Sequence, residues 1–154
     1  MSDKIKWTIV EKILRIIEVI AVVAAAIIIP LQIHESQNNQ EDRSFSMIIR
    51  LDEKLKQGAN REILYTISKN KPILKENGGK FESYELDCYL DDLDSIEDAF
   101  LRKIIDKDAT YDWFSDYIIK TFKNKEIAGY LLKIRKEDPQ YFLGLEKFAK
   151  EMTR

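Results

Sequence analysis

The chain has 154 residues, of which 45% are apolar and 34% are charged, and its formal net charge is −2. This length allows one membrane segment and one compact domain of roughly a hundred residues. The nearly balanced charge provides no basic field for nucleic acid, so we expect no nucleic-acid partner. There are only 5 glycines and 3 prolines, which argues against a turn-rich β fold, and the predicted fold class is all-α.

The most apolar stretch lies at residues 13–33, and residues 19–31 contain no polar side chain. A helix rises about 1.5 Å per residue, so about 20 residues cross the roughly 30 Å hydrocarbon core of a bilayer. The sequence therefore predicts an N-terminal transmembrane helix, with residues 1–34 as a membrane anchor in contact with the lipid bilayer. Glu11, Arg15 and Glu18 follow one helical stripe at i, i+4 and i+7, which predicts a polar seam between packed anchors.

Two other interpretations of residues 13–33 stay open. A buried or coiled-coil helix needs only an apolar stripe, whereas residues 19–29 are apolar around the whole circumference. A cleaved signal peptide would explain Lys4 and Lys6 as its basic end, but two acidic residues are wrong for that region and no small-x-small cleavage site follows. We expect a retained, single-pass anchor in the cell membrane.

The orientation of the anchor is ambiguous in the sequence. Four basic residues precede the apolar core, and none follows it before Arg43, so the positive-inside bias places the N-terminus in the cytoplasm and the main domain outside. A lone Cys88 and the absence of an N-x-S/T sequon favour a cytoplasmic domain instead.

Residues 35–58 are predicted to form a helical extension or stalk, because neither glycine nor proline occurs there before Gly58. The polar run SQNNQED at residues 36–42 would also suit a hinge, although we favour a continuous helix. An apolar face recurs at helical spacing at Phe45, Ile48, Ile49, Leu51 and Leu55.

Residues 59–154 are predicted to form a soluble, compact multi-helix bundle. Asn60 is a candidate N-cap for a helix that ends before Pro72, and the glycine pair at residues 78–79 marks the next turn. After this turn, the chain shows the strongest helical periodicity in the domain and is predicted to form a long helix. The side of this helix that is expected to be buried consists of Leu86, Tyr89, Leu90, Leu93, Ile96, Phe100, Leu101 and Ile104.

Three further helices complete the predicted bundle. Asp108 or Thr110 is expected to begin the first, and Asn124 is expected to cap the second. The last helix is expected to open with Asp138 as its N-cap and Pro139 in its first turn.

Three segments of this domain carry a resemblance to a known family: residues 84–106 (YELDCYLDDLDSIEDAFLRKIID), 112–118 (DWFSDYI) and 127–152 (IAGYLLKIRKEDPQYFLGLEKFAKEM). Together with the anchor, they resemble an uncharacterised bacterial family of small membrane-anchored helical proteins, defined only as a domain of unknown function. The matching elements are Tyr89-Leu90, Ile104-Ile105-Asp106 and Arg135 ahead of Leu145-Glu146. The resemblance implies this architecture and no established activity.

Asp87, Asp91, Asp94 and Asp98 recur at i, i+4, i+7 and i+11, so four carboxylates line one helical face. This stripe is either a solvated face, a face on which a partner docks, or a site for Mg²⁺ or Ca²⁺. As a solvated face it would pair with cations of the later helices. The candidates are Lys120, Lys123, Lys133, Arg135 and Lys136.

No motif predicts a catalytic, cofactor-binding or metal-binding residue. The acidic residues around Asp108 fail as a calcium loop because Tyr111 stands where the loop needs glycine. His34 and Cys88 are the only residues of their types, which leaves neither a zinc site nor a Cys-His pair. We expect no cofactor.

Two classes of function remain. The first is a non-enzymatic, membrane-tethered interaction or assembly module, a homo-oligomer or the binder of a protein partner. A variant of it is an oligomeric effector at the membrane in bacterial self-limitation or phage defence. The alternative is a metal-dependent enzyme that uses the Asp87, Asp91, Asp94 and Asp98 carboxylates.

Overall fold

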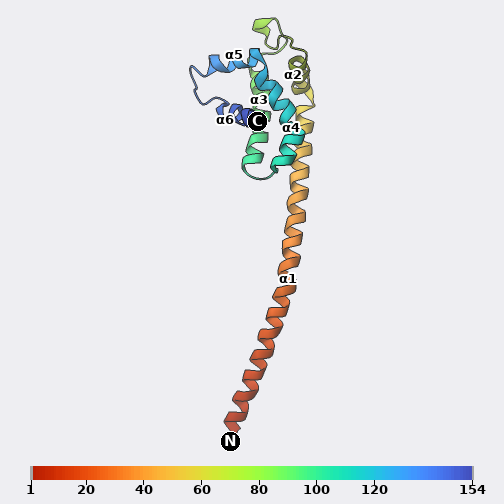
Figure 1. Cartoon of the computed structure of the whole chain (residues 1–154), viewed down its shortest axis with the longest axis vertical. Helices are drawn as coiled ribbons and strands as arrows, with labels where there is room; N and C mark the ends of the chain where they lie inside the picture. Colours follow the sequence, from red (N-terminus) through yellow and green to blue (C-terminus); the bar gives the residue numbers. More distant parts are fainter. Residues whose placement is uncertain (1, 154) are drawn as a thin grey trace. The chain divides into compact units, whose positions relative to one another are not determined.

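The computed structural model describes the backbone of residues 2–153, and their side chains except those of residues 2–14, 16, 19–21, 25, 33 and 38. The helices are α1 (Ser2–Leu55), α2 (Gly58–Ser68), the short 3-10 helix η1 (Lys75–Asn77), α3 (Ser83–Leu101), α4 (Lys107–Lys123), α5 (Lys125–Ile134) and α6 (Leu143–Met152) (Figure 1). Within residues 2–153 the only β pairing is an isolated bridge between Leu74 and Phe81. The prediction of an all-α fold is therefore confirmed for this part of the chain.

The chain divides into two units, Met1–Asp42 and Arg43–Arg154. The first consists of α1 alone. Among the residues that the structure describes, we find no helix with the length and apolar character needed to cross a membrane. The predicted span at residues 13–33 falls partly on side chains outside the described set, as does Glu11 of the predicted polar seam.

The second unit has a single hydrophobic core to which every α-helix contributes. It includes the last turns of α1, because Ile48, Leu51 and Leu55 are buried, so these turns belong to the bundle and not to a separate stalk. The helix α4 contacts α2, α3, α5 and α6, and Figure 1 shows α3 and α4 running antiparallel on either side of a tight turn. Residues with no exposed surface at its centre are Leu86, Tyr89, Leu90, Leu93, Ile96, Phe114, Ile118, Ile127 and Leu145.

The predicted apolar faces coincide with this core except at three positions, of which Ile49 on α1 is half-buried but not part of the core. Phe45 on α1 and Leu101 on α3 are exposed. Leu101 is the last residue of α3, where Lys103 takes a left-handed conformation and turns the chain. Ala99 and Ile105 are buried on either side of it instead. Leu101 is two residues after the buried Ala99 and therefore points to the opposite side of α3.

Two of the predicted helix caps are wrong. Gln57 precedes α2, because Gly58 at φ +51° turns the chain directly out of α1, and the Asn60 amide instead donates to Asp92 at 2.7 Å. Asp138 accepts from the Gln140 N–H in a turn, and α6 starts only at Leu143.

The cap predicted at Asn124 is confirmed, since its Oδ1 accepts from the N–H groups of Glu126 and Ile127 at 3.0 and 3.2 Å. α4 begins slightly earlier than predicted. Asp106 is its N-cap and accepts from the Ala109 N–H at 2.8 Å.

Candidate functional site

The four stripe aspartates lie on α3, and we call them the acidic face: Asp87, Asp91, Asp94 and Asp98. The helix is fixed at its start by a reciprocal capping box, in which Glu82 and Glu85 each accept from the other's backbone N–H. Asp87 is half-buried, whereas the other three are exposed. The face therefore begins at a packed contact within the bundle and continues into solvent.

The buried end of the acidic face belongs to the bundle. The Tyr130 hydroxyl on α5 donates to Asp87 Oδ1 at 2.5 Å. Burial raises the pKa of Tyr130, and the bond to Asp87 raises it further, so the phenol stays neutral and keeps its proton for this bond. Asp87 thus holds α5 against α3, and it is a structural residue more than a free docking group.

The middle of the face carries carboxylates that repel one another. Burial, and then the neighbouring Asp87 and Asp92, raise the pKa of Asp91. Burial, and then Asp91 and Asp98, raise the pKa of Asp94. These shifts show that the negative charge is only partly neutralised, so a cation brought to this face would be attracted.

Glu97, next to the acidic face, is the most strongly perturbed carboxyl group in the described part of the chain. Burial, together with Asp94, Asp98 and Glu151, raises its pKa to about 7. Its carboxylate packs against the first turn of α6, since a Cβ atom on Gly144 would lie 3.0 Å from Glu97 Oε1. The contact between α3 and α6 therefore contains an acid that titrates near neutrality.

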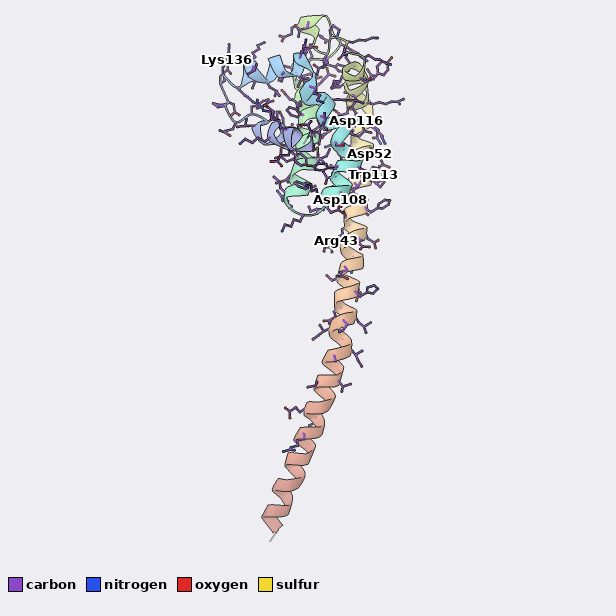
Figure 2. All side chains as sticks on the ribbon, viewed as in Figure 1. Arg43, Asp52, Asp108, Trp113, Asp116 and Lys136 are labelled. Atoms are coloured by element: carbon purple, nitrogen blue, oxygen red, sulfur yellow. The ribbon has the colours of Figure 1, made fainter. Side chains whose placement is uncertain are left out.

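Three of the five cations predicted to pair with the acidic face bind elsewhere, and the other two, Lys123 and Lys136, have no ion pair with it among the described residues. Figure 2 shows Lys136 on the segment that follows α5. Lys120 pairs with Asp116 on its own helix, Lys133 pairs with Glu76, and Arg135 pairs with Glu146. The partners of the α3 carboxylates are Arg102, which binds Asp98 at 2.9 Å, and Lys54, which binds Asp92.

Metal binding finds no support in this geometry. Among the described residues, no three His, Cys, Asp or Glu side chains are grouped closely enough to hold a metal ion. Asp106, the first residue of the rejected calcium loop, acts as a helix cap. Cys88 on α3 and His34 on α1 are both exposed.

The remaining residues of the predicted polar seam are described only in part. Arg15 and Glu18 lie on α1 with exposed side chains. They are three residues apart, on the same side of the helix. The seam thus presents charge of both signs.

Arg135 fixes the start of the C-terminal helix α6 through three contacts. Its Nε donates to the Tyr141 carbonyl at 2.8 Å, its Nη2 donates to the Phe142 carbonyl at 3.1 Å, and its Nη1 binds Glu146. Phe142 is in the left-handed conformation at φ +48°, which is unusual for a residue with a side chain. The guanidinium satisfies the carbonyls of this strained turn and joins it to α6.

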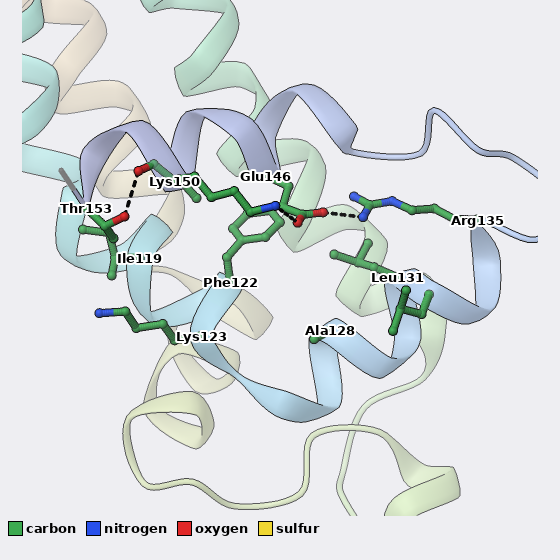
Figure 3. A pocket seen from close by; sticks show the side chains of 11 residues that line it. Ile119, Phe122, Lys123, Ala128, Leu131, Arg135, Glu146, Lys150 and Thr153 are labelled. Carbon is green, nitrogen blue, oxygen red and sulfur yellow. Dashed lines mark hydrogen bonds and ion pairs between the residues drawn. The ribbon is translucent and has the colours of Figure 1, made fainter.

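Beside this ion pair, α4, α5 and α6 enclose a groove of about 340 Å³ (Figure 3). Its apolar floor, which defines the apolar groove, consists of Ile119, Phe122, Ala128, Leu131, Leu132 and Ala149. Lys123, Arg135, Glu146 and Lys150 stand around its rim. Figure 3 shows Arg135 and Lys150 approaching the Glu146 carboxylate from different directions.

Sequence reasoning missed the Arg135–Glu146 pair and the groove. Both residues were recognised as matching elements of the resemblance, but Arg135 was predicted to pair with the aspartate stripe of α3 and not with Glu146. The sequence did contain a signal for the pair: residues 135–142 form a short connection with Pro139 between two short amphipathic helices. The carbonyl groups of such an irregular connection need hydrogen-bond donors from elsewhere in the chain.

The chain was compared with protein-family models, curated proteins and solved structures, and none of the three comparisons gave a match.

Proposed function

We propose that this protein is a membrane-tethered helical interaction module, in which the N-terminal segment attaches the chain to a bilayer and the helical bundle presents the acidic face to a cationic partner. The observation that carries the proposal is the exposure of apolar side chains along α1. Seven are between 49% and 64% exposed: Ile17, Val22, Val23, Ile27, Ile28, Ile29 and Leu31.

The distribution of these side chains supports a lipid environment. They occupy consecutive as well as alternate positions, so they point around the whole helix and not along one stripe. Contiguous apolar surface of this kind marks contact with a membrane or a protein. The sequence between residues 19 and 31 contains no polar side chain, which favours hydrocarbon as the surrounding medium.

The acidic face supports the interaction part of the proposal. Asp91 and Asp94 are exposed, and burial, followed by repulsion from neighbouring carboxylates, raises the pKa of both. A partner with lysine or arginine side chains would relieve this repulsion. The resemblance to a membrane-anchored helical family stays a prediction.

Extraction of membranes with alkaline carbonate tests the attachment. We expect the full chain to stay with the membrane, and the variant Val22→Lys/Ile28→Lys to be released, because each mid-membrane lysine costs about 2.5–3.5 kcal/mol. The control Gln37→Lys/Gln40→Lys adds the same charge outside the apolar run. Release of the parent chain by carbonate would overturn the proposal, as would equal behaviour of the two lysine variants.

Self-association through the polar seam is tested separately. We expect the detergent-solubilised chain to have the mass of an oligomer that Glu18→Leu weakens. A monomer that the substitution leaves unchanged would remove the assembly role of the seam.

The effector variant of the proposal predicts a cellular effect. Overexpression should be toxic, and Val22→Lys/Ile28→Lys should abolish the toxicity while the control lysine pair keeps it. Harmless overexpression of the parent chain would eliminate this variant but leave the tether intact. Protease accessibility of the C-terminus in intact cells distinguishes a cytoplasmic from an external bundle.

A further inference from the structure

We propose that the apolar groove between α4, α5 and α6 binds a single-chain amphiphile with an anionic head, such as a fatty acid. This inference concerns only the second unit and does not depend on membrane attachment by α1. The groove combines an apolar floor with a rim in which cations outnumber carboxylates. Such a combination matches a ligand that has a hydrocarbon chain at one end and a negative charge at the other.

The floor of the groove is suited to a hydrocarbon chain. Its volume of about 340 Å³ lies at the lower end of the roughly 300–1,000 Å³ found for small-molecule sites. Leu132 at its edge is 67% exposed, although it follows the buried Leu131 on the same helix. A bound chain would cover Leu132 together with the half-buried Phe122 and would remove their apolar surface from water.

The rim is suited to an anionic head. The rim carries three cationic side chains, Lys123, Arg135 and Lys150, and a single carboxylate, Glu146. Arg135 already uses its guanidinium for Glu146 and two carbonyl groups, so it acts as a fixed wall. Lys150 also pairs with Glu146, so Lys123 is the rim cation that has no ion pair among the described residues. Its flexible stem can bring the ammonium group to a head group at the opening.

The geometry favours one orientation of the ligand. Figure 3 shows Lys123 beside Ile119 at one end of the groove, whereas Arg135 lies at the other end near Leu131. Because the Arg135 end is closed by its ion pair with Glu146, the head is expected at the Lys123 end. A cationic head would meet like charge there, and a neutral head would leave Lys123 without an ion pair, whereas Lys150 already pairs with Glu146.

Photolabelling of the full chain tests this inference. The protein is held in neutral maltoside micelles that contain a small fraction of a 14-carbon fatty acid with a diazirine on its chain, and labelled peptides are mapped by mass spectrometry. Two matched probes carry the same chain with an alcohol or a trimethylammonium head. We expect the carboxylate probe to label residues 119–132 and 146–153 about fivefold more than either matched probe, since exposed ion pairs contribute up to about 1 kcal/mol.

Matched variants separate specific binding from general partition into the micelle. Lys123→Ala/Lys150→Ala should remove the preference for the carboxylate probe, whereas Lys120→Ala/Lys147→Ala, on the same two helices but outside the groove lining, should keep it. Ala128→Trp fills the groove and should block labelling by all probes. Ala59→Trp, at an exposed position on α2, should not.

Equal labelling by the three head groups would overturn the proposal, and so would groove labelling that Ala128→Trp leaves unchanged. A groove that carries no label in the parent chain would overturn it as well. Melting curves of each variant, followed by circular dichroism, establish that the substituted chains are folded before labelling.

Discussion

Replacement of Arg135 by glutamine should destabilise the bundle more than any other single exchange of a surface cation. The Arg135 side chain is 16% exposed and its Glu146 partner is 23% exposed, so solvent screens this pair only partly. The substitution removes the guanidinium charge that faces Glu146 and the guanidinium donors to the Tyr141 and Phe142 carbonyls, although Glu146 keeps Lys150 and the Phe142 carbonyl keeps the Glu146 N–H. A hydrogen bond to a charged group contributes about 1.5–3 kcal/mol.

From these contacts we expect Arg135→Gln to lower the free energy of unfolding by about 2–4 kcal/mol, because water replaces part of what is lost. The second unit has the size of a small single domain, and for such a domain this loss of stability corresponds to a fall in Tm of about 8–16 °C. Arg135→Lys should have an intermediate effect, because it keeps the charge but loses the planar fork that reaches three acceptors.

Trp113 provides the assay. The chain has two tryptophans, so a Trp7→Phe background makes fluorescence report on the second unit alone during thermal and urea unfolding. Arg102→Gln is the matched control, since Arg102 binds Asp98 with a 69% exposed side chain and should contribute only about 0–1 kcal/mol. If Arg135→Gln and Arg102→Gln have equal effects, the role assigned to the Arg135 contacts is refuted.

Three other substitutions should have distinct effects. The folded-state pKa of Glu97 is about 7 and its ordinary value is 4.5, so the folded chain keeps a proton that the unfolded chain has lost, and stability falls as the pH rises from about 4.5 through about 7. Glu97→Gln should therefore be more stable than the parent at pH 8. The expected gain is only about 1 kcal/mol, because solvent and the first turn of α6 offset part of the repulsion. Urea titrations at pH 5 and pH 8 should show that this difference in stability shrinks at the lower pH, and an unchanged difference would contradict the role assigned to Glu97. Asn124→Ala removes the cap of α5 and should destabilise the bundle by about 0.5–2 kcal/mol in urea unfolding, whereas Asn124→Ser keeps an acceptor for the following N–H groups and should lose less; equal losses would contradict the capping role. Tyr89→Phe leaves the buried Thr121 hydroxyl with only its bond to the Tyr117 carbonyl and should cost about 1–2 kcal/mol in urea unfolding; full stability would show that the 2.6 Å contact between the two hydroxyls contributes nothing.

Helical periodicity and local capping chemistry account for the part of the fold that could be predicted. The apolar face of α3 repeats without interruption over several turns, so Leu86, Leu90 and Leu93 were placed in the core correctly. Asn124 was recognised because its side chain needs only the two following N–H groups. Such signals act within a few residues, so they could be recognised without knowledge of the tertiary contacts.

The cap predictions that failed were overridden by side-chain contacts outside the helix turn that carries the signal. Asn60 has the right chemistry for a cap, but its amide binds Asp92, which is 32 residues away. Asp138 is followed by a proline, yet Arg135 draws the next residues into an irregular turn and delays α6 to Leu143.

The acidic face was only half predictable for the same reason. Spacing places Asp87, Asp91, Asp94 and Asp98 on one side of α3, but it does not reveal that Tyr130 approaches Asp87. Nor does it reveal that Lys120, Lys133 and Arg135 are already paired with other carboxylates. The charge that remains on this face could be assigned only once those pairs were located.

The most direct test of the central claim is the depth at which α1 lies in a bilayer. In a background with both native tryptophans replaced by phenylalanine, Ile27→Trp places one tryptophan in the apolar run, and the full chain is reconstituted into vesicles whose lipids carry bromine at defined positions along the acyl chain. We predict blue-shifted emission that bromine near the chain ends quenches most strongly, whereas Gln37→Trp should respond only to quenchers near the head groups. Water-like emission from Ile27→Trp that no brominated lipid quenches would contradict the membrane tether.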